Sequence, residues 1–281
     1  MKPVISFFLI LCLSAVVQAQ TLTSHKCEVA DGYNFWLYTP DSSIAEEVEP
    51  KPVIIFLHGA SLCGNNLDKV RRYGTIDAIE KGRKLDAYVI APQNPGGSWN
   101  PRKVMNVLDY VSDEHNIDYD RVYVAGMSLG GFGTIDVAAS YPDRIAAAMA
   151  ICGGGTVADL SPLTEVPLWI VHGTADRAVS ISQSDKVAEK IKEASDSGAS
   201  RLVYDRVEGW THGTPARLFY LPETYEWLMS HTLKDPERSI SNTFTLNNAL
   251  LRGAYQGLRS AKVKSSYKRR RTPKRARKIS R

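Results

Sequence analysis

Apolar residues in this chain gather in short continuous runs that alternate with longer segments of helical periodicity. The continuous runs lie at residues 52–57, 87–91, 122–125, 146–151, 168–171 and 202–207, and runs of this kind are typical of strands buried on both faces of a parallel sheet. Helical spacing occurs between them, at 67–73, 104–115, 132–140, 182–194 and 216–231. The alternation predicts one doubly wound, mostly parallel α/β sheet with helices on both faces.

The first residues have the pattern of an export signal. Lys2 precedes an apolar run over residues 4–16, and residues tolerated at a cleavage site follow at 17–19. The run is short for a membrane span, so residues 1–19 are predicted to be a cleaved signal peptide, with an uncleaved anchor as the alternative. We therefore expect a secreted or periplasmic protein.

Charge is distributed unevenly along the chain. The formal net charge is +5, yet residues 261–281 contain eleven Lys or Arg and no Asp or Glu, so the remainder is net negative. Residues 20–235 are predicted to form the folded domain, which begins with strands at 27–30 and 33–38 joined by an Asp31-Gly32 turn. Residues 236–281 are predicted to be a polar, then strongly basic, disordered tail that is able to contact anionic surfaces.

A Gly-x-Ser-x-Gly motif connects a predicted strand to a predicted helix. It reads Gly-Met-Ser-Leu-Gly over residues 126–130. In this context the motif predicts a nucleophile elbow, a tight turn that exposes the serine next to a helix N-terminus. Ser128 is therefore the candidate nucleophile, and an ordinary glycine-rich turn is the alternative.

A serine hydroxyl becomes a nucleophile when a histidine accepts its proton and a carboxylate orients that histidine. Asp176 follows the apolar run at 168–171 closely, which places it at the active edge of the sheet and makes it the candidate acid. Asp185 and Asp205 are rivals, but the first lies in a predicted helix and the second in a predicted strand. His212, in the loop between the last strand and the last helix, is the candidate base.

The same sheet edge offers donors for an oxyanion. The loop at residues 57–60, Leu-His-Gly-Ala, follows a predicted strand and would supply the N–H of Ala60, while Leu129 supplies a second N–H directly after the nucleophile. Many hydrolases carry a lid after the strand at 146–151. Here only a short loop at 153–165 follows it, so we expect no lid domain and an open cleft that suits bulky or polymeric esters.

Taken in order, five motifs resemble those of the α/β-hydrolase superfamily. They are Leu57-His58-Gly59-Ala60, Ala91-Pro92-Gln93, Gly126-Met127-Ser128-Leu129-Gly130-Gly131, His172-Gly173-x-x-Asp176 and Thr211-His212-Gly213. Within the superfamily the chain resembles secreted esterases of the feruloyl esterase, acetylxylan esterase and polyhydroxybutyrate depolymerase-like group, and related predicted peptidases. The resemblance covers roughly residues 51–231 and implies Ser128 as nucleophile, His212 as general base and Asp176 as orienting acid. The segment Ser61-Leu62-Cys63-Gly64 and the basic tail depart from the family pattern.

Two tryptophans are candidates for binding substrate. Trp99 follows the strand at 87–91 and Trp210 precedes the base by two residues, so either could stack on a sugar or an aromatic acid. Packing beneath the loops is the alternative for both. Arg177, beside the acid, faces either a substrate carboxylate or solvent.

The sequence favours a hydrolase that uses neither metal nor cofactor. It has no His-x-x-x-His pair, no Cys/His cluster of zinc spacing and no glycine-rich nucleotide motif. Cys27, Cys63 and Cys152 remain after signal removal and allow at most one disulfide within the chain, whose pair the sequence leaves open.

The predicted function is that of a secreted serine carboxylic-ester hydrolase acting through an acyl-enzyme, on feruloyl- or acetyl-type esters that decorate polysaccharides. The alternatives are a serine peptidase of the same fold and a non-catalytic binding protein on a hydrolase scaffold. The sequence leaves the acyl group, the alcohol and the oligomeric state open.

Overall fold

A nine-stranded sheet forms the centre of the protein. The structure is a computed structural model and describes residues 20–41, 49–195, 198–240, 244–258 and 264–267. Within them the strand order is β8-β7-β6-β5-β3-β4-β2-β1-β9. The strands are β1 (Thr21–His25), β2 (Asn34–Thr39), β3 (Lys51–Leu57), β4 (Tyr88–Gln93), β5 (Ile117–Met127), β6 (Ala147–Ile151), β7 (Leu168–Gly173), β8 (Leu202–Val207) and β9 (Lys264–Tyr267).

Six strands, from β3 to β8, run parallel to one another. β2 pairs antiparallel with both β4 and β1, and β9 pairs parallel with β1. The predicted doubly wound, mostly parallel sheet is therefore confirmed, and the loops that follow the parallel strands lie along one edge.

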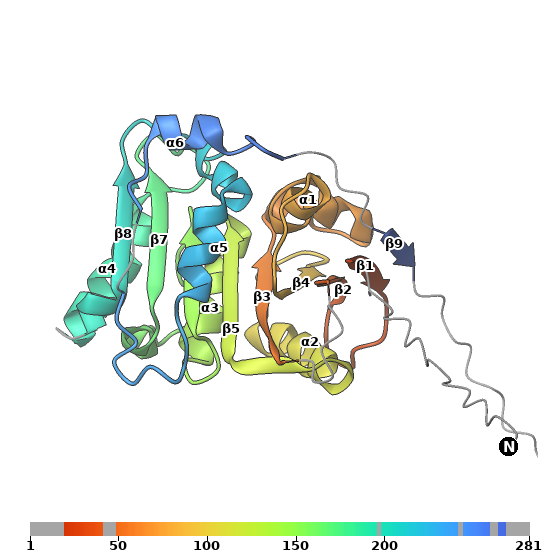
Figure 1. Cartoon of the computed structure of the whole chain (residues 1–281). Helices are drawn as coiled ribbons and strands as arrows, with labels where there is room; N and C mark the ends of the chain where they lie inside the picture. Colours follow the sequence, from red (N-terminus) through yellow and green to blue (C-terminus); the bar gives the residue numbers. More distant parts are fainter. Residues whose placement is uncertain (1–19, 42–48, 196–197, 241–243, 259–263, 268–281) are drawn as a thin grey trace, which may run out of the picture.

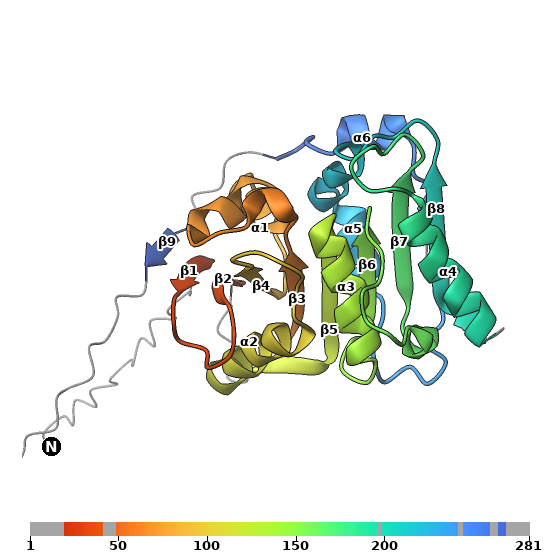
Figure 2. The same cartoon turned by 180° about the vertical axis from the view of Figure 1, so that it is seen from behind.

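Helices cover both faces of this sheet (Figures 1 and 2). On one face α1 (Thr75–Glu80) and α5 (Pro222–Met229) bury their apolar sides in one core cluster. On the other face α2 (Pro101–Glu114), α3 (Leu129–Ser140) and α4 (Ser182–Ala194) pack into a second cluster. Short 3-10 turns complete the connections, at η1 (Ala60–Leu62), η2 (Leu67–Arg72), η3 (Ser161–Glu165), η4 (Gly198–Arg201) and η5 (Thr214–Tyr220).

Two predicted elements differ from the structure. The strand predicted at 27–30 is wrong: β1 lies earlier, and the positive φ angles of Cys27 and Asp31 turn the chain between β1 and β2. The single helix predicted at 216–231 is split into η5 and α5 at Leu221, which is extended because Pro222 follows it.

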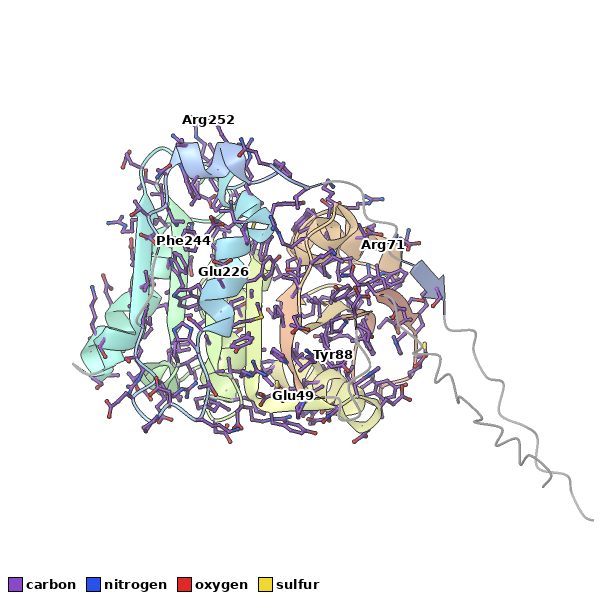
Figure 3. The ribbon with its side chains drawn as sticks, in the orientation of Figure 1. Glu49, Arg71, Tyr88, Glu226, Phe244 and Arg252 are labelled. Atoms are coloured by element: carbon purple, nitrogen blue, oxygen red, sulfur yellow. The ribbon has the colours of Figure 1, made fainter. Side chains whose placement is uncertain are left out.

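The fold continues beyond the predicted domain end at residue 235. The helix α6 (Asn248–Gly253) buries Leu251. Figure 3 labels Phe244, which lies beside α5, and its ring centroid is 4.6 Å from that of Trp169. The segment returns to the sheet as β9. The disordered tail predicted from residue 236 is therefore wrong for 236–240 and 244–258, whose apolar side chains pack on the α5 side of the sheet, and for 264–267, whose backbone pairs with β1.

The predicted signal segment, residues 1–19, and the basic residues 268–281 lie outside the described residues. Among the helices that the structure describes, none combines the length and apolar character needed to cross a bilayer.

Candidate active site

Ser128 lies on a strained turn between β5 and α3. Its φ of 58° and ψ of −123° fall outside the regions that residues with a side chain favour. The turn passes so close to β3 that a Cβ on Gly130 would lie 1.8 Å from the carbonyl oxygen of Leu57. A Cβ on Gly126 would lie 2.4 Å from the carbonyl oxygen of Gly130. Side chains at Gly126 and Gly130 would therefore collide with neighbouring backbone, so both positions require glycine. The close approach places Ser128 beside the loop after β3.

Asp176 and His212 are joined by a hydrogen bond between the loops that follow β7 and β8. His212 Nδ1 lies 2.7 Å from Oδ2 of Asp176. The Asp176 side chain is 0% exposed and that of His212 is 27% exposed. The carboxylate is thus shielded from water while the ring reaches the surface of the site.

Backbone donors hold the Asp176 carboxylate in place. The N–H groups of Ala178 and Val179 donate to Oδ1 at 2.8 and 2.9 Å. Burial by itself would raise the pKa of Asp176, but the Val179 N–H, the His212 ring and the Ala178 N–H together bring the pKa below its ordinary value. The acid is ionised and accepts from His212 Nδ1–H, which leaves Nε2 of the ring free to take a proton.

Ser128 and His212 line one cavity of about 620 Å³. Among the described residues the Ser128 hydroxyl makes no hydrogen bond. In the predicted catalytic role, a contact between this hydroxyl and His212 Nε2 would have to form on substrate binding, as catalytic hydrogen bonds in unliganded enzymes often do. The other lining residues are mostly small or apolar: Gly59, Ala60, Ser61, Tyr73, Met127, Ala178, Val179, Gly213 and Ala216.

This arrangement can be compared with known proteins. No model of a known protein family matches the chain. It is 28% identical over 173 residues to a bifunctional acetylxylan esterase/xylanase of Neocallimastix patriciarum, covering 58% of the chain and 24% of that protein. It is 25% identical over 232 residues to poly(3-hydroxyalkanoate) depolymerase C of Paucimonas lemoignei, covering 62% of the chain and 53% of that protein. The chain thus spans about half or less of the length of these relatives.

Solved structures share the fold. A thermostable esterase matches with a TM-score of 0.60 at 24% identity, over 76% of this chain and 63% of that one. The feruloyl esterase module from Clostridium thermocellum, complexed with sinapinate, matches with a TM-score of 0.53 at 15% identity, over 82% and 91%. The chain has the α/β-hydrolase fold. In this fold the predicted nucleophile, acid and base occupy the loops after β5, β7 and β8.

The predicted oxyanion residues each begin a helix. Ala60 begins η1 and Leu129 begins α3, and the first N–H groups of a helix lack partners within it. A Cβ built on Gly59 would lie 3.3 Å from Cβ of Ser128, so the loop after β3 borders the nucleophile. Ala60 and Leu129 remain predictions as oxyanion donors.

Both tryptophans predicted to bind substrate are in the core, and that prediction is wrong for each. Trp99 and Trp210 are each 3% exposed. The Trp99 indole donates to the carbonyl of His58 at 3.2 Å, and the Trp210 indole donates to Oδ1 of Asn248 at 2.7 Å. Rings with their faces covered and their N–H groups paired support the active-site loops from beneath and have no face free for a sugar.

Tyr73 is a residue of the cavity that sequence reasoning missed. Its hydroxyl accepts the N–H of Gly59 at 2.7 Å, and burial raises the pKa of the phenol, which stays protonated. Tyr73 follows η2 and belongs to none of the five motifs. Only the fold reveals its place beside Gly59.

The cysteines are free thiols, and one of them lies behind the acid. Cys27, Cys63 and Cys152 form no disulfide in the described chain. Ligand atoms of Cys152, Asp176 and His212 lie within 4.8 Å of one another. Burial raises the pKa of the Cys152 thiol, so it stays neutral, and Asp176 and His212 already engage each other. Cys152 therefore packs behind the Asp176–His212 pair as a neutral thiol.

Proposed function

We propose that the protein is a serine carboxylic-ester hydrolase that works through an acyl-enzyme. The observation that carries the proposal is the 2.7 Å contact between His212 Nδ1 and Asp176 Oδ2, beside a cavity that also contains the strained Ser128. A buried, ionised acid fixes the tautomer in which His212 Nε2 accepts a proton.

The reaction follows from these positions. As Ser128 Oγ attacks the ester carbonyl carbon, its proton passes to His212 Nε2, and the oxyanion forms beside the N–H groups of Ala60 and Leu129. Collapse of the intermediate breaks the bond to the alcohol oxygen, and His212 returns the proton to that oxygen. Water then attacks the acyl-enzyme by the same relay and releases the carboxylic acid.

The proposed substrates are acetyl or feruloyl esters that decorate polysaccharides. Two features support this choice. Residues 152–166, where many hydrolases carry a lid, contain only a short connection with η3, so a polymer can approach the cavity. Relatives and fold neighbours include an acetylxylan esterase and a feruloyl esterase module.

The ends of the chain complete the proposal. Residues 1–19 have the composition of a cleaved signal peptide, so we propose that the enzyme is secreted or periplasmic. Residues 268–281 are proposed to hold it on anionic surfaces by their clustered Lys and Arg.

Fluorophosphonate labelling tests the nucleophile, and paired substrates test the reaction class. The wild-type protein should label and should hydrolyse nitrophenyl acetate faster than an aminoacyl anilide, whereas Ser128→Ala should do neither. Labelling that survives Ser128→Ala would show that the nucleophile is wrong. Anilide turnover without ester preference would favour the peptidase alternative, and absence of both activities would favour a binding protein.

A further inference from the structure

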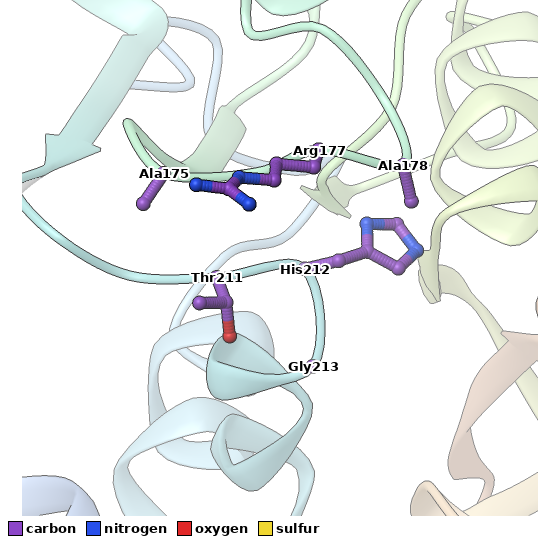
Figure 4. A pocket seen from close by; sticks show the side chains of 6 residues that line it. All are labelled: Ala175, Arg177, Ala178, Thr211, His212 and Gly213. Atoms are coloured by element: carbon purple, nitrogen blue, oxygen red, sulfur yellow. The ribbon is translucent and has the colours of Figure 1, made fainter.

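A second cavity of about 510 Å³ adjoins the catalytic cavity across His212. Figure 4 shows its six lining residues, Ala175, Arg177, Ala178, Thr211, His212 and Gly213. Ala178, His212 and Gly213 also line the catalytic cavity. The two hollows therefore meet at the base of the proposed triad, and a substrate can occupy both.

The walls of this second cavity are two loops that are tied together. The Ala175 N–H donates to the carbonyl of Trp210 at 3.1 Å, and the Gly209 N–H donates to Oγ1 of Thr174 at 3.0 Å. A Cβ on Gly173 would lie 2.0 Å from the same Trp210 oxygen, so the loops are in close contact. The wall that carries Arg177 thus keeps a fixed position relative to His212.

Arg177 supplies the single charge of the lining. Its neighbours in the cavity are two alanines, a threonine, a glycine and the ring of His212. Arg177 is exposed, and among the residues that the structure describes no carboxylate pairs with it. A guanidinium binds a carboxylate through two parallel hydrogen bonds, which a lysine does not reproduce.

The chemistry of the triad identifies which part of a substrate would meet Arg177. His212 Nε2 returns its proton to the departing alcohol oxygen, so the alcohol leaves on the His212 side. The acyl group then takes the cavity beside Ser128, where Tyr73, Met127 and Ala216 line the wall. The second cavity is on the path of the alcohol.

We propose that Arg177 binds a carboxylate on the alcohol portion of the ester, so that the enzyme prefers acyl groups carried by acidic alcohols such as the uronic-acid units of a polysaccharide. This inference rests on the proposed ester hydrolysis. Arg177 would determine specificity only. It is neither the nucleophile, the base nor an oxyanion donor, so the acyl-transfer steps do not require it.

Matched small esters test the assignment. The acetyl ester of 4-hydroxybenzoate carries a carboxylate on its leaving group, and methyl 4-acetoxybenzoate carries an uncharged group at the same position; acetate release is measured for both. Arg177→Ala should lower kcat/KM for the charged ester about tenfold relative to the neutral one, mainly through KM. Arg177→Lys should lose less, and Arg177→Glu should reverse the preference. The wild-type preference should also weaken in salt.

Controls separate this inference from the proposed function. Arg144→Ala removes the same charge from a surface arginine that lines neither cavity, and it should leave the ratio of the two esters unchanged. Acetyl release from acetylated polyuronate should fall in Arg177→Ala while release from acetylated neutral xylan holds. If the neutral ester is cleaved normally but the ratio does not move in Arg177→Ala, the inference is wrong and the esterase stands. If the wild type cleaves neither ester, both are wrong.

Discussion

His172 Nε2 lies 3.3 Å from Oδ2 of Asp176, the carboxylate oxygen that also accepts the hydrogen bond of His212. His172 is 0% exposed, and its Nε2 also lies 3.1 Å from the carbonyl of Val179. Since both neighbours of Nε2 can only accept, this nitrogen carries a ring proton, while Nδ1 lies 2.8 Å from Ser184 Oγ, whose hydroxyl donates to the carbonyl of Gly153 at 2.8 Å. Burial lowers the pKa of His172, which keeps the ring neutral. His172 is therefore a positioning residue behind the acid.

His172→Phe should shift the acid limb of the kcat/KM profile to higher pH. Without the second donor, the charge on Oδ2 acts more strongly on His212 and stabilises its protonated form. The expected fall in kcat/KM at neutral pH is about fivefold, equivalent to one ordinary hydrogen bond. His172→Gln keeps an N–H donor at a similar distance from the backbone, so the acid limb of its kcat/KM profile should lie at the wild-type pH. An unmoved pH profile in the Phe variant would mean that His172 only fills space.

Asp176→Asn should lower kcat by roughly 10⁴-fold, the effect known for this change in serine proteases. The backbone N–H groups at Oδ1 select the amide oxygen there, so the NH₂ group faces His212 Nδ1 and forces the proton onto Nε2. That tautomer cannot accept from Ser128. Steady-state hydrolysis of nitrophenyl acetate measures the loss. The matched control is Asp185→Asn on α4, where the carboxylate accepts from Tyr204, and it should stay within about twofold of wild type.

Gly130→Ala should abolish esterase activity or prevent folding. The added methyl would meet the Leu57 carbonyl at 1.8 Å, and backbone cannot yield as a side chain does. Gly253→Ala adds the same methyl in α6, where its nearest neighbour is the Gln256 side chain at 3.6 Å. That control should keep full activity and should match or slightly exceed wild type in thermal unfolding. A folded, active Gly130→Ala variant would contradict the tight turn.

Acid should destabilise the protein between about pH 6.5 and 4, partly through His58. Burial lowers the pKa of His58 from 6.5 to about 4. Nε2 accepts the Asn94 N–H at 3.0 Å, so the folded form is neutral. In this window the unfolded chain binds a proton that the folded protein does not, and the free energy of unfolding falls as the pH falls, by up to about 3 kcal/mol.

Urea unfolding at several pH values measures this dependence. The His58→Gln variant should be less stable at pH 7 yet lose less stability on acidification. The buried His172 and His231 have pKa values lowered in the same direction and remain in both proteins, so the difference between the two curves isolates His58. Parallel curves would contradict its neutral, buried state.

Removal of residues 268–281 should leave hydrolysis of nitrophenyl acetate unchanged, because the described active site contains none of them. Retention on an anionic matrix such as heparin-agarose should fall, and the salt needed for elution should drop. A variant with the Lys and Arg of this segment changed to Gln separates charge from length. Unchanged retention in both variants would remove the proposed anionic contact.

The chemistry-bearing loops could be predicted from sequence because each follows an apolar strand directly. The bounds predicted for β8 and α4 match the structure, and Asp176 and His212 lie in contact as expected. Proximity along the chain does not reveal where a side chain points, and for that reason the sequence predicts Trp99 and Trp210 to bind substrate although both are buried.

Long-range packing explains the remaining differences. The apolar residues of 244–258 are scattered among polar ones, and Phe244, Leu246 and Leu250 are partly buried because they pack against the core cluster on the α5 side of the sheet. The Tyr73 hydroxyl accepts a hydrogen bond from Gly59, which is 14 residues earlier in the chain, and no local sequence pattern indicates this contact. Neither relationship has a periodicity that a sequence window can detect.

The pairing of β9 with β1 determines where the basic segment departs from the fold. β9 and β8 stand at opposite ends of the strand order, and the loop after β8 carries His212. An enzyme tethered by the residues after Tyr267 would be held at the β9 edge of the sheet, with β1, β2 and β4 between that edge and the loops after β3 and β5 that border the cavity. Such a tether would let a surface-bound enzyme act at successive positions on a polymer without dissociating from the surface.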